Sequence, residues 1–385
     1  MMESTANGEG PGVGMAHCKE APSDRRVIVL DESYFPAWDR FVLGRGGAMV
    51  QHTSAWMQVL ERSFPHLRGR ILAVADPVSG AIEAGLPVYE VRSQFLGNRV
   101  MSVPHATFCP PLVRSDSKEM GMLLSALIRM AREGSFRRIE LRWRERDRLP
   151  GATSERPPAG ETLFWHHYVD LNQAREELWR GLSRTAVRRK IRDAERAGIV
   201  VDCATKEEEV IVFHRLLSAT RRRLGLPAMP LRFLQEIWGT LGSEHRRLWL
   251  ARKGDQIVAG LLATMAGEML GLDYYGEEED VRDLGVNALL YWNALCEAQE
   301  MGMDRFSLGR TGMSGASDGL LEFKRRWGGV EEKLAYRELI LGGRRAGTKV
   351  RATSGLSRKQ MQYLLRRMPS VLHRCCSNLF YRHWA

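Results

Sequence analysis

The 385-residue sequence contains no apolar run that approaches the ~20 residues that a membrane-spanning helix needs. Its first residues also lack the charged and apolar regions of a secretory signal peptide. A hydrophobic content of 44% and a charged content of 27% are ordinary for a globular protein. These features together predict a protein that stays in the cytoplasm.

The six cysteines form no C-x-x-C pair and have no spacing that is typical of metal ligands. We therefore expect reduced thiols, and we predict no metal site. The sequence also lacks the G-x-S-x-G turn of serine hydrolases and a Cys/His pairing signature. A covalent intermediate on the protein is therefore not expected, and direct transfer chemistry is favoured.

Acidic residues are absent from the segment 341–385, whose ten Lys and Arg residues account for nearly all of the net charge of +11. Apolar residues recur there at helical spacing between the basic ones, and Pro369 should divide the helix. A basic amphipathic segment of this kind lies well on an anionic membrane surface. The same pattern also fits a helix that docks on the protein's own body.

Two long stretches of the chain share one order of predicted elements. Each has helices, three strands, a helix and a strand that ends in arginine, and I-E-A-G-L at Ile82 matches I-V-A-G-L at Ile257. This repeat predicts an α/β protein made of two copies of one unit, with mixed central sheets flanked by helices. The predicted divisions are a disordered leader over 1–26, a first unit over 27–150, a linker at about 144–160, a second unit over 151–340 and a basic tail over 341–385.

The stretch 304–338 carries a polar pattern that is typical of an anion site. Phe306 and Leu308 alternate with polar neighbours as on a half-buried strand, and a Gly/Ser loop and a short apolar helix follow. This order brings Arg310 and Lys324 to the two ends of one polar loop. Two fixed cations beside a flexible loop suit a phosphate or a carboxylate. Ordinary solvated surface cations are the alternative.

The same stretch reads G-R-T, a glycine loop, F-K-R-R-W-G and L-A-Y-R-E-L, and a basic helix V-R-R-K-I-R-D-A-E-R-A-G begins at Val187. In this order the motifs resemble those of the FemAB-related acyltransferases. That group includes CelD-like proteins of exopolysaccharide clusters and FemAB-like proteins associated with exosortase (PEP-CTERM) systems. The resemblance covers about residues 27–340 and implies tandem duplicated GNAT (acyl-CoA N-acyltransferase) domains. The chain departs from the family pattern at Ser307, where Asp is usual, and after His105, where glycines are usual.

In a GNAT unit, the donor's pyrophosphate lies on backbone N–H groups at the start of the helix after the fourth strand, where the helix dipole favours anions. This chain reads R-D-L-G-V-N-A at that place. The resemblance therefore implies that Arg282, Gly285 and Asn287 bind the donor's phosphates. A plain helix start is the alternative, and the acidic run at 277–280 would repel a phosphate.

The basic helix supplies further cations, namely Arg188, Arg189, Lys190 and Arg192. Such clusters attract negatively charged ligands, so we expect them to capture a phosphorylated donor or acceptor. A solvated basic helix explains the same residues without any ligand.

Acyl transfer to an amine requires a base that accepts the proton of the amine. Asp273 and Tyr275 lie at the end of the predicted strand beside the presumed donor site. They are therefore the candidate catalytic residues, with packing of the tyrosine as the alternative.

We therefore expect an N-acyltransferase that uses acyl-CoA as a co-substrate, with no permanently bound cofactor. Its acceptor would be an amino sugar or similar amine on a glycan or lipid-linked precursor, in cell-envelope or exopolysaccharide synthesis. The alternative is a FemAB-like enzyme that uses aminoacyl-tRNA and modifies a peptidoglycan precursor. Those tRNA users commonly carry a coiled-coil insertion, and the absence of a heptad run here favours the thioester donor. A third reading is a non-catalytic assembly protein that binds glycan or nucleic acid. The protein would be cytoplasmic, with peripheral contact to the membrane through 341–385.

Overall fold

The computed structural model describes residues 25–93, 97–114, 117–147, 160–313, 318–341, 358–370, 372, 373, 377 and 381. The predicted leader over 1–26 and linker over 144–160 lie mostly outside these residues. The strands are β1 (Arg26–Leu30), β2 (Leu67–Ala75), β3 (Ile82–Val91), β4 (Arg99–Met101), β5 (Arg138–Arg144), β6 (Gly160–Asp170), β7 (Ile199–Cys203), β8 (Arg246–Lys253), β9 (Gln256–Ala266), β10 (Met269–Glu277), β11 (Arg305–Gly312) and β12 (Val330–Ile340). The helices are α1 (Phe35–Leu43), α2 (Ser54–Ser63), α3 (Ser117–Glu133), α4 (Arg175–Gly181), α5 (Arg189–Arg196), α6 (Glu207–Arg223), α7 (Leu231–Thr240), α8 (Val286–Glu300), α9 (Asp318–Arg325) and α10 (Arg358–Arg367). Single turns are η1 (Glu32–Tyr34), η2 (Val50–His52), η4 (Arg184–Arg188) and η5 (Arg282–Leu284).

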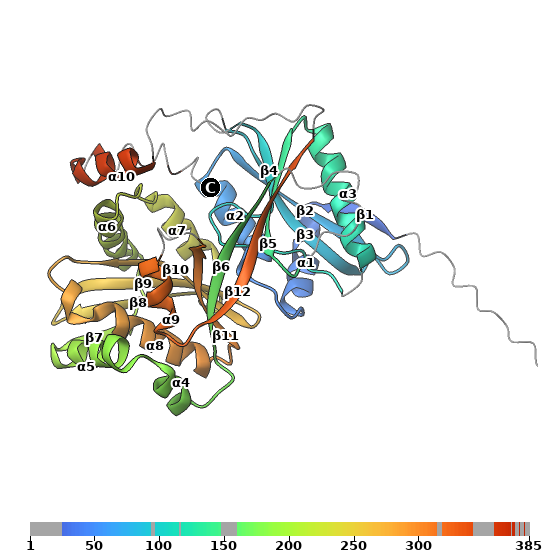
Figure 1. The fold of residues 1–385 in the computed structure, drawn as a ribbon. Coiled ribbons are helices and arrows are strands. Elements are labelled where there is room, and N and C mark those ends of the chain that lie inside the picture. The colour runs from blue at the N-terminus through green and yellow to red at the C-terminus, as the bar shows by residue number, and fades with distance from the viewer. Residues whose placement is uncertain are drawn as a thin grey trace, which may run out of the picture.

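The strands of the described chain form one mixed sheet of twelve, in the order β1-β2-β3-β4-β5-β12-β6-β11-β10-β9-β8-β7. The pairs β4·β5 and β10·β11 are parallel, and the other pairs are antiparallel. This confirms the mixed α/β architecture that the sequence predicts. The two expected sheets are continuous because β12 lies between β5 of the first half and β6 of the second (Figure 1).

Helices cover both faces of this sheet (Figure 1). In the first half, α3 packs on β2, β3 and β5, while α1 and α2 lie on the opposite face. In the second half, α5 and α8 cover one face of β8 to β11, and α6 and α7 cover the other. One apolar core passes between the halves, because the ring of Phe233 on α7 packs against Trp56 and Phe64. The ring centroids lie 6.1 and 5.1 Å away.

Helix α6 lies across the strand β10 and has charges that stabilise its two ends. Its first turn carries Glu207, Glu208 and Glu209, and its last turn carries three arginines. Carboxylates near the N-terminus and cations near the C-terminus both interact favourably with the helix dipole. The backbone of α6 comes close to β10 at Gly276, where a side chain would collide with Leu217. The glycine therefore fixes how closely this helix approaches the strand.

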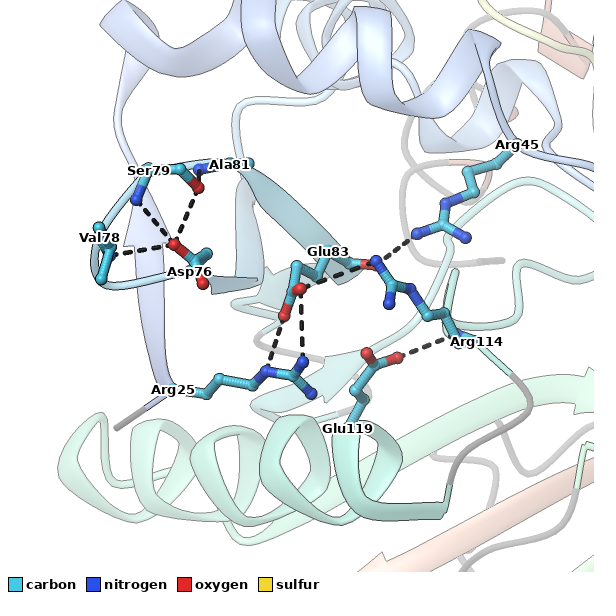
Figure 2. Close-up of polar contacts among 9 residues, drawn as sticks. All are labelled: Arg25, Arg45, Asp76, Val78, Ser79, Ala81, Glu83, Arg114 and Glu119. Carbon is cyan, nitrogen blue, oxygen red and sulfur yellow. Dashed lines mark hydrogen bonds and ion pairs between the residues drawn. The ribbon is translucent and has the colours of Figure 1, made fainter. Parts of the chain in front are cut away.

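A cluster of ion pairs around Glu83, at the start of β3, ties several segments of the first half together (Figure 2). Arg25 reaches its carboxylate at 2.9 Å and Arg114 at 3.7 Å, while Arg45 donates to the Glu83 carbonyl oxygen at 2.7 Å. The backbone N–H of Arg114 donates to Glu119 of α3 at 2.9 Å. Because these pairs are partly exposed, each contributes at most about 1 kcal/mol, and together they fix the loops before α2 and α3.

The described part of the tail docks on the body of the protein. Helix α10 ends at Arg367, two residues before Pro369. Leu365 is buried where α10 meets α6, and His373 donates to the carbonyl oxygen of Leu226 at 2.9 Å. Within the described ranges, no helix is both long and apolar enough to span a bilayer.

The close contact between α6 and β10 predicts that a methyl group added at Gly276 destabilises the protein. A Cβ at position 276 would lie 2.4 Å from the backbone nitrogen of Leu217. Gly276→Ala should therefore lower the free energy of unfolding by about 1–3 kcal/mol, as overpacking does in other cores. Denaturant titration of the purified protein measures this change.

The matched control is Gly271→Ala on the same strand, whose Cβ would meet its nearest atom, the Thr264 carbonyl oxygen, at 3.7 Å. This is ordinary van der Waals contact, so the control should unfold like the wild type. Equal stability of both variants would contradict the predicted clash.

Candidate active site

The two central parallel strands of the second half separate partway along their length. β10 and β11 pair over three residues each, and the last pair joins Gly271 to Ser307. Beyond this pair, β10 remains paired with β9 and β11 with β6. In open α/β sheets, ligands bind near the carboxyl ends of parallel strands, where neighbouring strands diverge. We therefore expect a reaction centre where β10 and β11 separate.

Each of these strands carries a β-bulge just where the separation begins. The register of β10 against β9 shifts between Leu272 and Tyr274, which leaves Asp273 as the extra residue. The register of β11 against β6 shifts between Ser307 and Gly309. Bulges are frequent next to active sites because they re-aim side chains. Here they direct polar side chains of both strands toward the first half of the protein.

A cavity of about 30 Å³ lies between the separated strands and the first half. Asp273 and Ser307 line it from the second half, and Gln51, Thr107 and Phe108 line it from the first. Since one water needs roughly 10–15 Å³ of such volume, the cavity has room for about two waters or a group as small as an acetyl. The halves of the chain thus build this site together.

Asp273 has the properties of a base at neutral pH. The Thr264 hydroxyl donates to its Oδ2 atom at 2.7 Å. Burial raises the pKa of Asp273 to about 7, although the bonds from Thr264 act in the opposite direction. The carboxyl group therefore accepts a proton readily near pH 7, while still existing partly as the carboxylate.

Tyr275, the second candidate catalytic residue, does not line this cavity. Its hydroxyl donates to Glu277 at 2.6 Å, and its ring packs 6.0 Å from that of Tyr291 on α8. Burial raises the pKa of Tyr275 well above its usual value, so the phenol stays protonated. The bulge at Asp273 explains this placement, because it turns Tyr274 rather than Tyr275 toward the α6 side of the sheet.

Lys324 and Arg310 lie close together, as the sequence predicts, but in different surroundings. Lys324 is only 4% exposed, and its Nζ donates to the carbonyl oxygens of Gly309 at 2.9 Å and Arg310 at 2.8 Å. Burial and the nearby Arg310 charge lower the pKa of Lys324 to about 7. Arg310 is exposed, with its guanidinium over the rings of Phe164 at 4.7 Å and Tyr336 at 4.9 Å. Lys324 thus fixes the end of β11, and Arg310 faces solvent.

The predicted phosphate site at the start of α8 is closely covered by α5. Gly285 has a φ angle of +83°, and a Cβ there would lie 2.3 Å from the carbonyl oxygen of Lys190. Asn287 accepts the N–H of Ala288 at 2.8 Å, and Arg282 is exposed on η5. Gly285 therefore has a packing role, which the sequence pattern alone does not distinguish from a role in phosphate binding.

The basic helix consists of η4, which has π-helical geometry, followed directly by α5. Arg189 and Arg192 are exposed, whereas Arg188 and Lys190 are partly buried. The Nε atom of Arg188 is buried and has no hydrogen-bond partner among the described residues. A buried donor without a partner is costly unless a ligand or water binds it, which is consistent with the predicted capture of an anion.

Sequence reasoning missed a polar array beside the cavity. His166 on β6 contacts Ser307 through Nε2, with 2.7 Å between that nitrogen and the serine Oγ. Its Nδ1 lies 3.6 Å from a carboxylate oxygen of Glu332 on β12. No local motif marks this array, since Ser307 and His166 are 141 residues apart.

The tail reaches the same region of the structure. The ring of Tyr381 is buried and stacks on His105 with centroids 5.0 Å apart and planes inclined by 7°. The guanidinium of Arg221 lies 5.5 Å from that ring. His105 is held at a φ angle of +56°, which is uncommon for a residue with a side chain. Tyr381 therefore packs against the interface between the two halves.

The chain is similar to one known domain family and to several solved structures. Residues 182–325 match the family model described as the acetyltransferase (GNAT) domain, a range that contains Asp273, Arg282 and Lys324. No curated protein sequence matches the chain. Among solved structures, FemX superposes with a TM-score of 0.66 at 15% identity, over 80% of this chain and 97% of that chain.

Two further structures share the fold. L-PGS from Bacillus licheniformis superposes with a TM-score of 0.52 at 12% identity, over 91% of this chain and 97% of that chain. A tandem GNAT protein from the clavulanic acid biosynthesis pathway superposes with a TM-score of 0.50 at 13% identity, over 83% of this chain and 100% of that chain. Residues 182–325 thus match a GNAT acetyltransferase domain, and the fold of the chain is similar to the folds of FemX, L-PGS and a tandem GNAT protein.

Proposed function

We propose that the protein is an N-acyltransferase that moves an acetyl or similar group from a coenzyme A thioester to an amine. The observation that carries this proposal is the placement of Asp273 where β10 and β11 separate, in a cavity that both halves line. This cavity has room for an acetyl group, which would lie between the strands next to a carboxyl that accepts protons near pH 7. The acceptor would be an amino sugar or similar amine in cell-envelope or exopolysaccharide synthesis.

The chain's own residues divide the work in this proposal. An amine acceptor arrives mostly as an ammonium ion, and Asp273 takes a proton from it so that its nitrogen can attack. Arg188, Arg282 and the neighbouring cations of α5 would hold the phosphates of the donor, and Asn287 would contribute at the start of α8. Lys324 keeps the end of β11 in place through two carbonyl groups, and Arg310 would contact an anionic part of the acceptor.

A second candidate is transfer of an amino acid from aminoacyl-tRNA to a peptidoglycan precursor, as FemAB proteins do. The FemX superposition, which covers nearly all of that chain, favours this alternative. A surface feature also supports it, because Trp179 and Trp292 stand 4.9 Å apart in an open pocket of about 390 Å³ beside Arg175 and Arg180. Aromatic rings among cations suit stacked bases and a phosphate backbone.

Titration calorimetry with acetyl-coenzyme A distinguishes a thioester donor from an aminoacyl-tRNA donor. Wild-type protein should bind the thioester, and Arg188→Ala and Arg282→Ala should each weaken binding about tenfold or more, since each removes a charged hydrogen bond to phosphate. The matched control is Arg129→Ala on α3, an exposed arginine of the first half. No binding at millimolar ligand would exclude the thioester donor, and binding of aminoacyl-tRNA instead would establish the second candidate.

Replacement of Asp273 tests the proposed base. Asp273→Asn should reduce kcat/KM by roughly 10²–10⁴, the usual contribution of a general base. In the wild type, kcat/KM should rise with pH through about 7, because the carboxylate form is the active one. The pH profile of amide formation with acetyl-coenzyme A and glucosamine measures both effects. A variant that keeps the wild-type rate and profile would exclude Asp273 as the base.

The stability of Asp273→Asn shows whether a loss of activity is due to misfolding. The folded carboxyl keeps its proton up to about pH 7, whereas the unfolded one loses it near ~4, so wild-type stability should fall between these values. Asp273→Asn removes this dependence and should melt at the same temperature as the wild type, or higher, at pH 8. A lower melting temperature at pH 8 would show that the lost activity reflects misfolding.

We further propose that α10 contacts an anionic membrane surface that holds a lipid-linked acceptor. Although Leu365 docks on the body, Tyr363, Leu364 and Leu372 are 54%, 45% and 54% exposed. Arg366 and Arg367 are exposed on the same helix. Exposed apolar side chains flanked by arginines are typical of helices that lie in the interface of an anionic bilayer.

Vesicle sedimentation tests this contact. The protein should pellet with phosphatidylglycerol vesicles but not with phosphatidylcholine vesicles, and the triple variant Tyr363→Ser, Leu364→Ser, Leu372→Ser should remain in the supernatant. Val78→Ser is the matched control, because Val78 is 94% exposed in a loop of the first half (Figure 2). Equal pelleting of the triple variant would mean that α10 serves only to cover the body.

A further inference from the structure

Three polar side chains lie in a row on three adjacent strands beside the cavity. β12, β6 and β11 are neighbours in the sheet, and Glu332 and His166 are directly opposite each other in the register of β12 and β6. His166 Nε2 lies 2.7 Å from Ser307 Oγ, and His166 Nδ1 lies 3.6 Å from Glu332 Oε2. The serine and the histidine are thus hydrogen-bonded, the carboxylate lies just beyond hydrogen-bond distance of the histidine, and the serine lines the same cavity as Asp273.

The backbone around Ser307 supports a reactive hydroxyl. The bulge in β11 follows this residue, and Gly309 has a φ angle of +74° that favours glycine. The N–H of Gly309 donates to Ser307 Oγ at 3.2 Å. An N–H donor at this oxygen would stabilise negative charge as the hydroxyl loses its proton.

The protonation states of Glu332 and His166 also suit activation of the Ser307 hydroxyl. Burial raises the pKa of Glu332, but His166 and Arg146 together lower it below its usual value, so this side chain is a carboxylate. Burial lowers the pKa of His166, so the imidazole is neutral. The negative charge of Glu332, 3.6 Å from Nδ1, favours the ring proton on that nitrogen, which leaves Nε2 to accept the hydroxyl of Ser307. This is the arrangement that activates a serine nucleophile.

We propose that Ser307 carries the acyl group between donor and acceptor, so that transfer takes two steps. This inference rests on the proposed thioester donor. In the first step, Ser307 Oγ attacks the thioester carbonyl, a C–O bond forms and the C–S bond breaks. The hydroxyl proton passes to His166 Nε2 and then to the departing thiolate of coenzyme A.

In the second step, the free amine attacks the ester on Ser307, a C–N bond forms and the C–O bond breaks. The amine has already lost one proton to Asp273, and its second proton passes through His166 to Ser307 Oγ. Serine and histidine end in their starting states, and Asp273 releases its proton to the solvent. The products are therefore an amide, free coenzyme A and one proton. Asp273 and the array thus handle different protons in one cavity. This two-step path replaces the direct transfer that the sequence favours. The sequence favours direct transfer because no local motif reveals the array.

Mass spectrometry of the intact protein tests the acyl-serine. The full chain is mixed with acetyl-coenzyme A in the absence of an acceptor, and release of free thiol is followed in parallel. We expect one acetyl group per chain on the peptide that contains Ser307, and a burst of thiol equal to the protein concentration. Ser307→Ala should show neither, Ser307→Cys should still become acetylated, and His166→Gln should slow the burst by roughly 10²-fold or more.

Ser218→Ala is the matched control, because Ser218 is also buried and lies 3.4 Å from a histidine Nε2, that of His214, but on α6 outside the cavity. It should acetylate like the wild type. Amide formation from acetyl-coenzyme A and glucosamine without any adduct, and with Ser307→Ala fully active, would overturn the acyl-serine and leave the proposed function standing. Failure of acetyl-coenzyme A to bind in the calorimeter would instead remove the thioester donor, and the acyl-serine with it.

Discussion

The insertion of β12 between β5 and β6 is the constraint on which the rest of this structure depends. Residues 330–338 of this strand pair with β6 and residues 334–340 pair with β5, so its backbone hydrogen bonds belong to both halves of the chain. Leu334 on this strand is fully buried and helps to form the small core between the halves. Without this strand, β5 and β6 would both present open edges, which native sheets avoid.

This single strand also positions much of the polar site. It places Glu332 opposite His166 and brings Tyr336 beneath the guanidinium of Arg310. It therefore connects residues of both halves of the chain beside the cavity. The cavity between the halves follows from the same pairing, because a continuous sheet fixes how the loops of the first half face β10 and β11.

Within this frame, burial changes the chemistry of ordinary side chains. Two groups of opposite charge, Asp273 and Lys324, have their pKa values moved toward about 7 by burial, one upward and one downward. Such shifts are common at functional sites, where groups must exchange protons near neutral pH. The bulges in β10 and β11 have a comparable effect on geometry, since each redirects side chains that regular strands would point elsewhere.

The sequence alone determined the local elements and the kind of chemistry. Apolar periodicity predicts the strand around Phe306 and the helix that carries Lys324, which the structure places at β11 and α9. The G-R-T and F-K-R-R-W-G motifs led to the acyltransferase assignment, and the repeat led to the mixed α/β class. These features are encoded by residues within a few positions of one another, so they can be recognised without knowing what packs on them. The division into two units remains a prediction, because the halves share β12.

Only the tertiary structure decided the composition of the site. Ser307 was notable in the sequence merely for replacing an aspartate, yet it lies beside His166 and Glu332, which carried no signal. Gly285 matches a phosphate-binding pattern, but the backbone of α5 occupies the space that a side chain would fill. Tyr275 was paired with Asp273 by proximity in sequence, and one bulge separates them in space. The physical reason is the same in each case. Strand pairing, bulges and burial depend on residues far apart in the chain, and no local pattern records them.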